Sequence, residues 1–189
     1  MENFLQPKTL TFGKDIIKIE FKKNSVLKYF KNSEGYNDTI RFTNIMKKYN
    51  YYPKIIKLNK SDLMIEMENC GNLLSIRNLP DNWKEQLEVI RKSFLEYQIY
   101  VLDLRFMPYT PLIINNLCIK NKKIYLVDLV MHKIRSKNFI NKNFDYLIKQ
   151  IELYYFYRNN IFILYIFHIY FEVKRLLYSI YERLIYDDI

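Results

Sequence analysis

An asparagine and an aspartate twelve residues apart carry the clearest chemical signal in the chain. Asn116 and Asp128 border two short apolar runs, 117–119 and 124–127, which the polar turn 120–123 separates. This pattern predicts a tight β-hairpin, and both ends of a hairpin face the same edge. An amide oxygen and a carboxylate held there would suit Mg²⁺, a hard cation that prefers oxygen ligands. The alternative is a plain strand end with a solvated aspartate, and the spacing alone does not exclude it.

The segments before this hairpin predict a small sheet with one inserted helix. Polar turns separate strand-like runs at 9–12, 16–21, 25–30, 55–58 and 63–67. Apolar residues at helical spacing cover 37–49, and Pro53 marks the exit of that helix. The composition changes at 69–71. We therefore expect an α+β fold with a β-rich lobe over 1–68 and a mainly helical lobe over 69–189.

The second lobe is expected to be built mainly from helices. Asp81 is suited to cap a helix, and the pattern is helical again from about Asn143 to the end. Within this tail, 161–171 holds eleven residues without a formal charge at neutral pH. At about 1.5 Å per residue, this run covers roughly half of a bilayer core. We expect a buried or partner-binding helix and no membrane span, with an interfacial membrane role as the alternative.

Composition narrows the classes of function. Half of the residues are apolar or aromatic, which excludes a disordered chain. Cys70 and Cys118 lie outside any CxxC motif, and His132 and His168 are far apart, so a zinc site is not expected. No secretory signal pattern opens the sequence, and we expect a reducing, cytoplasmic location. The net charge of +10 would suit polyanions such as nucleic acid, but no long basic run concentrates it.

Four segments, taken in order, carry a family resemblance. They are the strand 26–30 with Lys28, the run 63–71, the run 78–87, and the hairpin segment 116–129. Together they resemble the protein-kinase-like superfamily, especially its small divergent members in large DNA viruses. The resemblance implies a reduced two-lobed protein-kinase-like fold that binds ATP and Mg²⁺ between a small β-rich lobe and a helical lobe.

The resemblance also assigns roles to the residues that contact a nucleotide. Lys28 would hold the α- and β-phosphates, and its alternative is a solvent-facing lysine on an edge strand. The run 63–71 would be the strand and hinge that contact adenine through the backbone, which makes Glu68 and Cys70 candidate cofactor-binding residues. A solvated strand position is the alternative for Glu68.

The catalytic roles fall on three further residues. Asn116 and Asp128 would hold Mg²⁺, and Asp103 would be the base that accepts the proton of the acceptor hydroxyl. However, Asp103 lacks the family's histidine and stands thirteen residues before Asn116, where the family has five. Residues 104–115 are therefore interpreted as an insertion that could displace the base.

Other departures also bear on catalysis. The first strands contain one glycine, Gly13, and no glycine-rich loop. The helix after the lysine strand has no glutamate at the expected place, because Arg41 and Phe42 occupy it. Leu129 and Val130 follow Asp128 in place of the family's phenylalanine and glycine. These departures predict weakened or lost catalysis.

The sequence thus supports three hypotheses about function. The first is a divergent, viral-type kinase-like protein, an ATP- and Mg²⁺-dependent phosphotransferase with impaired catalysis. The second is a non-catalytic scaffold that binds a protein partner, or a second copy, through the aromatic-rich tail 154–186. The third is a nucleic-acid binder, which rests on basic charge and aromatic residues and predicts binding that weakens steeply with salt.

Overall fold

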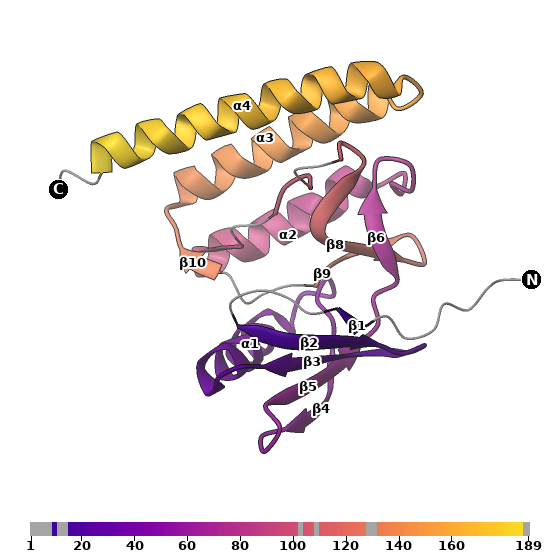
Figure 1. Cartoon of the computed structure of the whole chain (residues 1–189), viewed down its shortest axis with the longest axis vertical. Coiled ribbons are helices and arrows are strands. Elements are labelled where there is room, and N and C mark those ends of the chain that lie inside the picture. Colours follow the sequence, from indigo (N-terminus) through magenta and orange to yellow (C-terminus); the bar gives the residue numbers. More distant parts are fainter. Residues whose placement is uncertain (1–8, 11–14, 102–103, 108–109, 128–131, 187–189) are drawn as a thin grey trace, which may run out of the picture.

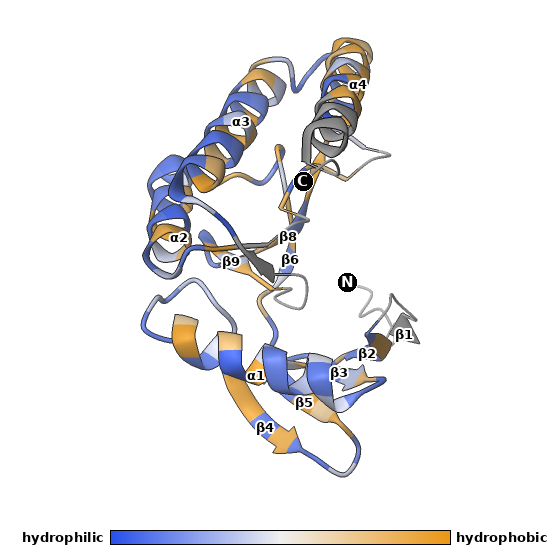
Figure 2. Cartoon of the chain, turned by 90° about the vertical axis from the view of Figure 1, so that its left-hand side faces the viewer, coloured by the Kyte–Doolittle hydropathy of each residue, from blue (hydrophilic) through white to orange (hydrophobic). Residues whose placement is uncertain are grey.

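The computed structural model describes residues 9–10, 15–101, 104–107, 110–127 and 132–186. Figure 1 shows two groups of elements: a sheet with one helix at the lower end, and three long helices with two smaller sheets above it. The perpendicular view in Figure 2 keeps the same division. The fold class is α+β, as predicted.

The first sheet has five strands in the order β1-β2-β3-β5-β4, and each neighbouring pair is antiparallel. The strands are β1 (Thr9–Leu10), β2 (Ile16–Phe21), β3 (Ser25–Phe30), β4 (Ile55–Asn59) and β5 (Met64–Glu68). Lys28 on β3 pairs with Ile19 on one side and Ile65 on the other. β3 is therefore a central strand, and the alternative that Lys28 stands on an edge strand is wrong.

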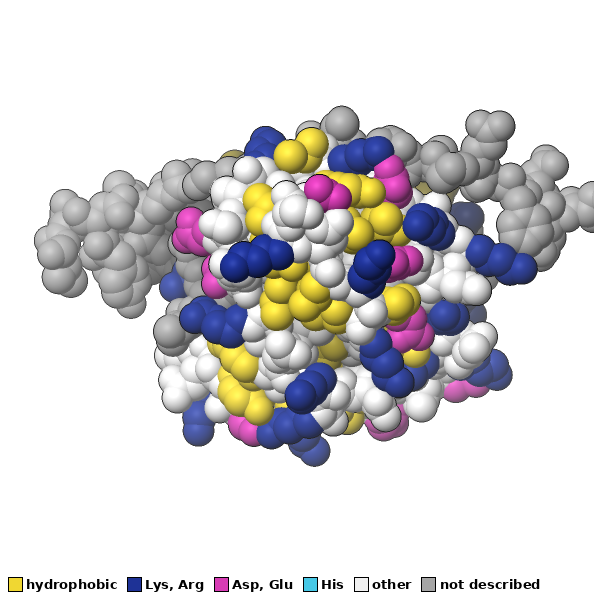
Figure 3. Space-filling view, turned by 90° about the horizontal axis from the view of Figure 1, so that it is seen from below, with side chains coloured by type: hydrophobic (Ala, Val, Ile, Leu, Met, Phe, Trp, Pro, Cys, Tyr) yellow, Lys and Arg dark blue, Asp and Glu magenta, His cyan; other side chains and the backbone are white. Residues whose placement is uncertain are grey.

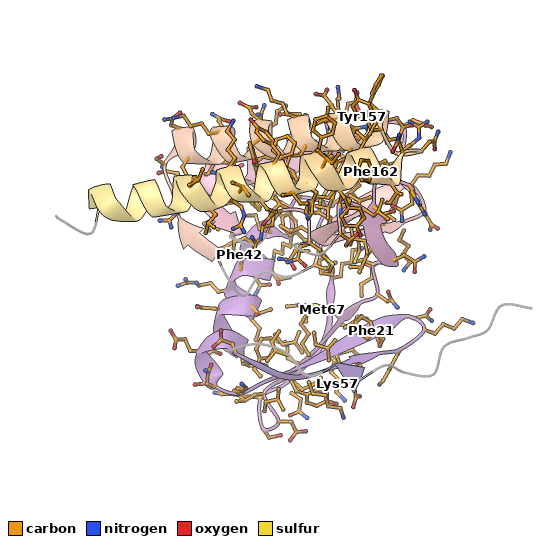
Figure 4. All side chains as sticks on the ribbon, turned by 45° about the horizontal axis from the view of Figure 1, so that its top comes forward. Phe21, Phe42, Lys57, Met67, Tyr157 and Phe162 are labelled. Carbon is orange, nitrogen blue, oxygen red and sulfur yellow. The ribbon has the colours of Figure 1, made fainter. Side chains whose placement is uncertain are left out.

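Helix α1 (Ser33–Met46) connects β3 to β4. It begins four residues before the predicted start because the side chain of Asn32 accepts a hydrogen bond from Gly35 N at 2.9 Å. Its first half packs on the sheet, where the rings of Tyr36 and Phe30 meet edge to face. Its second half belongs to the core of the helical part, to which Phe42 contributes (Figure 4). α1 thus joins the two groups of elements.

The second group alternates helices with short strands. Its elements are β6 (Asn72–Ser75), α2 (Trp83–Tyr97), β7 (Ile99–Val101), β8 (Ile113–Lys120), β9 (Lys123–Leu126), β10 (His132–Ile134), α3 (Lys137–Phe156) and α4 (Ile161–Tyr186). Three of the strands form a sheet in the order β6-β8-β9, and β7 pairs with β10. The three helices lie one above another in Figure 1, with α4 outermost. Apolar side chains of all three helices and of the β6-β8-β9 sheet form the larger core.

Several predicted boundaries in this part were wrong. Helix α2 begins at Trp83, and the N-cap position is Asn82 rather than Asp81. Helix α3 begins six residues before Asn143, because the Ser136 hydroxyl accepts a hydrogen bond from Phe139 N. The predicted continuous helical tail is two helices. Strand β6 was not predicted, because its four residues have no alternating pattern.

Two surface properties bear on the classes of partner. Among the described residues, no helix combines the length and the apolar character needed to cross a bilayer, which agrees with the prediction of no membrane span. Figure 3, viewed from below, shows Lys and Arg side chains spread among apolar and acidic ones over this face. The basic charge is dispersed there, which does not favour the nucleic-acid hypothesis.

Candidate functional site

Strands β8 and β9 form the predicted hairpin around a two-residue turn at 121–122. Both turn residues have a positive φ, 52° and 60°, as a type I′ turn requires. At the open end of the hairpin, Val127 N donates a hydrogen bond to Asn116 O at 2.9 Å. Asn116 therefore lies opposite the residue that precedes Asp128. Asp128 itself lies outside the described residues.

The predicted nucleotide-binding lysine reaches the same point. Lys28 keeps only 6% of its surface exposed, and its Nζ donates a hydrogen bond to Val127 O at 3.0 Å across 99 positions of sequence. Burial of an ammonium group is costly unless hydrogen bonds compensate it. Val127 thus binds Asn116 through its N–H group and Lys28 through its carbonyl group. The backbone of one residue brings two of the predicted site residues together.

The second predicted aspartate, Asp103, also lies outside the described residues. The strands that border the two aspartates in sequence nevertheless pair with each other. Val101 stands two residues before Asp103, and it pairs with His132, which stands four residues after Asp128. The β7–β10 ladder therefore brings together the two stretches of chain that border the predicted base and the predicted metal ligand.

The insertion 104–115 folds back on itself within its described residues. Asn115 N donates a hydrogen bond to Arg105 O at 2.6 Å, so the two ends of the excursion lie side by side. Phe106 is 1% exposed, and its ring centroid lies 4.6 Å from that of Tyr154 on α3. The insertion thus contributes to the core under α3. Its length adds little separation between residues 105 and 115.

A buried glutamine that the sequence analysis did not select anchors the hairpin to α2. Gln86 is 4% exposed. Its Nε2 donates a hydrogen bond to Lys122 O at 2.9 Å, and its Oε1 accepts one from Ile124 N at 2.8 Å. Along the same edge of β9, Leu126 N donates a hydrogen bond to Tyr51 O at 2.9 Å. The sequence carries no signal for these contacts, because a glutamine in a helix usually lies at the surface.

The predicted hinge is the segment between β5 and β6. Lys120 Nζ donates a hydrogen bond to Asn69 O at 2.8 Å and lies 3.7 Å from the Glu68 carboxylate. Gly71 has a φ of 86°, and a Cβ atom there would stand 2.3 Å from Ile119 O. Only glycine fits so close to a neighbouring backbone. The segment is therefore fixed against β8, and the side chain of Glu68 is engaged by Lys120.

Both cysteines lie near this segment and are free thiols. Burial raises the pKa of Cys70 to about 12, and the negative charge of Glu68 acts in the same direction. Burial raises the pKa of Cys118 to about 11, while the positive charge of Lys28 acts in the opposite direction. Both groups are protonated at neutral pH. Cys70 lies within the predicted hinge but is 3% exposed, so its side chain is a packing group there.

Helix α1 follows the lysine strand, as the resemblance implies, but its buried face carries no acid. The residues of that face are Gly35, Tyr36, Thr39, Phe42, Thr43 and Met46. Glu34 is exposed, and Asp38 pairs with Arg41 at 3.7 Å. The buried face of α1 therefore carries apolar and small polar side chains where the family has its glutamate.

Two surface cavities lie away from these contacts. One of about 530 Å³ is lined by Arg77, Arg158, Asn159 and Ile161. The other, of about 320 Å³, lies between the end of α1 and residues 49–55. Neither includes Lys28, Asn116 or the hinge. The candidate site therefore rests on the backbone and side-chain contacts at Val127.

Comparison with known proteins assigns no family: no family model matches the chain, and a search of curated proteins finds no match. The function is accordingly inferred from the residues and from their geometry.

Proposed function

We propose that the chain is a divergent protein-kinase-like protein that binds a nucleotide with Mg²⁺ at Lys28, Asn116 and Asp128, and that its phosphotransfer activity is impaired. The observation that carries the proposal is the double contact at Val127. The predicted phosphate-binding lysine and the predicted metal-binding asparagine bind the backbone of the residue before the predicted metal-binding aspartate. Of these contacts, the one from Lys28 joins elements 99 positions apart in the sequence.

The order of the elements supports the same proposal. In protein kinases the phosphate-binding lysine lies on the third strand, and Lys28 lies on β3. A helix follows that strand, and β5 leads directly into the segment that joins the two groups of elements. A small lobe over 1–68 and a larger lobe over 69–189 belong to this proposal.

The described residues fit a nucleotide phosphate in chemical type. Lys28 offers an ammonium group fixed by burial and by the Val127 carbonyl, and Asn116 offers an amide oxygen at the end of the same hairpin. ATP would supply the phosphoryl group, and Mg²⁺ would neutralise phosphate charge. The chain's own contribution would be to position these groups, since positioning and charge provide most catalysis in this class.

Impaired phosphotransfer follows from what surrounds the site. The buried face of α1 is made of apolar and small polar residues, whereas active kinases carry a glutamate on that helix. The insertion is not itself the cause of impairment, because its fold keeps residues 105 and 115 adjacent. We therefore propose that nucleotide binding persists and that turnover is slow or absent.

The test is a thermal-shift titration with ATP, with and without Mg²⁺. Lys28→Met removes the charge but keeps an apolar chain of similar length, and Lys57→Met makes the same change on the exposed strand β4. A ligand that binds the native state raises its melting temperature. We expect a Mg²⁺-dependent rise for the wild type and for Lys57→Met, and none for Lys28→Met. Absence of any rise at millimolar ATP would end the proposal.

A second proposal, a binding scaffold, is favoured by a separate observation. Along α4, large apolar side chains remain exposed, among them Phe162 at 73%, Ile169 at 62% and Leu177 at 61%. Exposed apolar surface of this extent marks interaction sites. The two proposals are compatible, because α4 is the outermost helix and Lys28 stands on the first sheet (Figure 1).

A further inference from the structure

Helix α4 presents two apolar faces, and the chain covers one of them. On the inner face, Leu164 and His168 are buried, and the ring of Phe171 lies 5.9 Å from that of Tyr154 on α3. The opposite face carries five side chains that are 51–73% exposed, which we call the outer stripe: Phe162, Ile166, Ile169, Val173 and Leu176. Figure 4 marks Phe162 at the start of this helix. Within the part of the chain that the structure describes, no element covers this stripe.

The spacing of the outer stripe is that of a coiled coil. Its members follow one another at intervals of four, three, four and three residues. Apolar residues that repeat every 3.5 positions on average form the seam along which two helices supercoil. Ile166 and Val173 hold one set of seam positions, and Phe162, Ile169 and Leu176 hold the alternate set. A seam of this kind is complementary to a second helix with the same repeat.

The exposed area is sufficient for a dimer. Tyr165, Tyr170 and Leu177 border the stripe and are 41–61% exposed. Together with the stripe they expose the surface of more than four large side chains, or roughly 700–900 Å² at about 150–200 Å² for each side chain. A stable interface buries about 800 Å² on each partner. One copy of this face, paired with another, therefore reaches the size of a specific interface.

The charges beside the stripe favour a protein helix over a lipid surface. A helix that lies in a membrane interface has a polar face rich in Lys and Arg. Here the face opposite the stripe packs on α3, and the borders of the stripe are held mainly by tyrosine and leucine, with Lys174 exposed beside them. Arg175 is engaged with Glu172 at 2.8 Å. An ion pair on the helix weakens attraction to anionic lipid, and the stripe itself is uncharged.

We propose that the outer stripe of α4 pairs with the outer stripe of a second copy of this chain, so that two α3–α4 hairpins form a symmetric helical dimer. Identical faces then meet about a two-fold axis, the usual arrangement of homodimers. This inference deepens the scaffold proposal and rests on it, and it names a second copy as the partner. It is independent of nucleotide binding at Lys28.

The test is sedimentation velocity across a range of protein concentrations. The wild type should approach twice the 23.3 kDa of the chain. Ile169→Glu places a charge at the centre of the stripe and should weaken dimerisation by about 100-fold or more. Ile56→Glu is the matched control, because Ile56 is 57% exposed on β4, far from α4 in sequence. This variant should dimerise like the wild type. A monomeric wild type at every concentration, or equal loss in both variants, overturns the proposal.

A vesicle assay separates a second copy from a membrane. If the wild type is monomeric and floats with phosphatidylcholine–phosphatidylserine vesicles, and Ile169→Glu does not float with them, the stripe binds lipid and the proposal is overturned. Each variant should also keep the melting temperature of the wild-type monomer and the same response to Mg²⁺-ATP. A dimerisation defect with an intact nucleotide response supports the pairing. If the nucleotide response is absent from all three proteins while the wild type and Ile56→Glu dimerise and Ile169→Glu does not, the nucleotide proposal alone fails.

Discussion

The contacts around Val127 and the outer stripe of α4 depart from ordinary protein surfaces in opposite ways. At Val127, the charged side chain of Lys28 is buried at 6% exposure, and it donates a hydrogen bond to Val127 O across 99 positions of sequence. On α4, large apolar side chains stand in solvent at 51–73% exposure. Buried charge and exposed apolar surface are the two informative deviations in a folded chain.

The difference between the two regions shows what kind of ligand each can take. The contacts of Val127 with Lys28 and Asn116 are made within one chain, and they fix the positions of both residues. A fixed ammonium group and a fixed amide group suit a small anionic ligand. The outer stripe is incomplete within one chain, so only a large surface can complete it. The regions should therefore respond differently to substitution: changes around Val127 should unfold the chain or affect nucleotide binding, and changes on the stripe should affect assembly.

A large loss of stability is expected from Gly71→Ala, in the hinge that borders the first region. The new Cβ would stand 2.3 Å from Ile119 O at a φ of 86°. Overpacking and a left-handed backbone together should cost about 3 kcal/mol of unfolding free energy. Urea denaturation measures the change. Gly35→Ala in α1 is the control, because a Cβ atom there would lie 3.2 Å from the Cβ of Asp15. This substitution should change the unfolding free energy by no more than about 1 kcal/mol.

Gln86→Leu should have the next largest effect. It leaves Lys122 O and Ile124 N without their partner in a buried place, at a cost of about 2–3 kcal/mol. The same substitution at Lys92, which is exposed on α2, should change stability by less than about 0.5 kcal/mol. Equal effects from the two variants, again by urea denaturation, would show that the hairpin does not depend on α2.

The cysteines beside the first region predict a loss of stability in alkali. Burial raises the folded-state pKa of Cys70 and of Cys118 above the ordinary value of 9.0, to about 12 and about 11. The folded chain therefore retains protons that the unfolded chain releases. This contribution is complete below pH 9 and is lost as the pH rises through the folded-state values, by about 1 kcal/mol for each cysteine between about pH 9 and pH 10.

Thermal unfolding at these two pH values measures the slope. The double variant Cys70→Ala/Cys118→Ala should show a smaller loss of stability between the two pH values. Part of the loss should remain, because buried tyrosines also have raised pKa values. An unchanged slope would show that the thiols are hydrated in the folded chain.

The smallest effect on the monomer is expected on the outer stripe. Ile169→Gln should change the unfolding free energy of the monomer by less than about 0.5 kcal/mol, because the side chain is 62% exposed. Leu164→Ala, on the inner face of the same helix, should cost about 2–4 kcal/mol because Leu164 is fully buried. Unfolding at low protein concentration measures both. Comparable losses would show that the outer stripe packs within the monomer.

The sequence predicts those parts of the fold that local patterns determine. The bounds of β2 and β3 follow from apolar runs between polar turns, and the β8–β9 hairpin follows from its turn. The break between α3 and α4 was missed because apolar and aromatic residues continue on both sides of it. Asn160 accepts a hydrogen bond from Ile163 N there, a capping signal that the sequence does contain.

The candidate site could be predicted only in part. The position of Asn116 opposite Val127 follows from the register of one hairpin. The contact between Lys28 and Val127 joins elements 99 positions apart, so no local pattern encodes it, and it was anticipated through the family resemblance alone. The folded insertion could not be predicted either, because its course depends on Phe106 meeting Tyr154 on a later helix.

Calorimetric titration of ATP, with and without Mg²⁺, into the wild type, Lys28→Met and Asp128→Asn tests the central claim most directly. We predict that the wild type binds ATP, that Mg²⁺ tightens this binding, and that Asp128→Asn loses the Mg²⁺-dependent gain. Lys28→Met should lose most of the affinity in either condition. An absence of binding by the wild type, or equal binding by all three proteins, would contradict a nucleotide site at Val127.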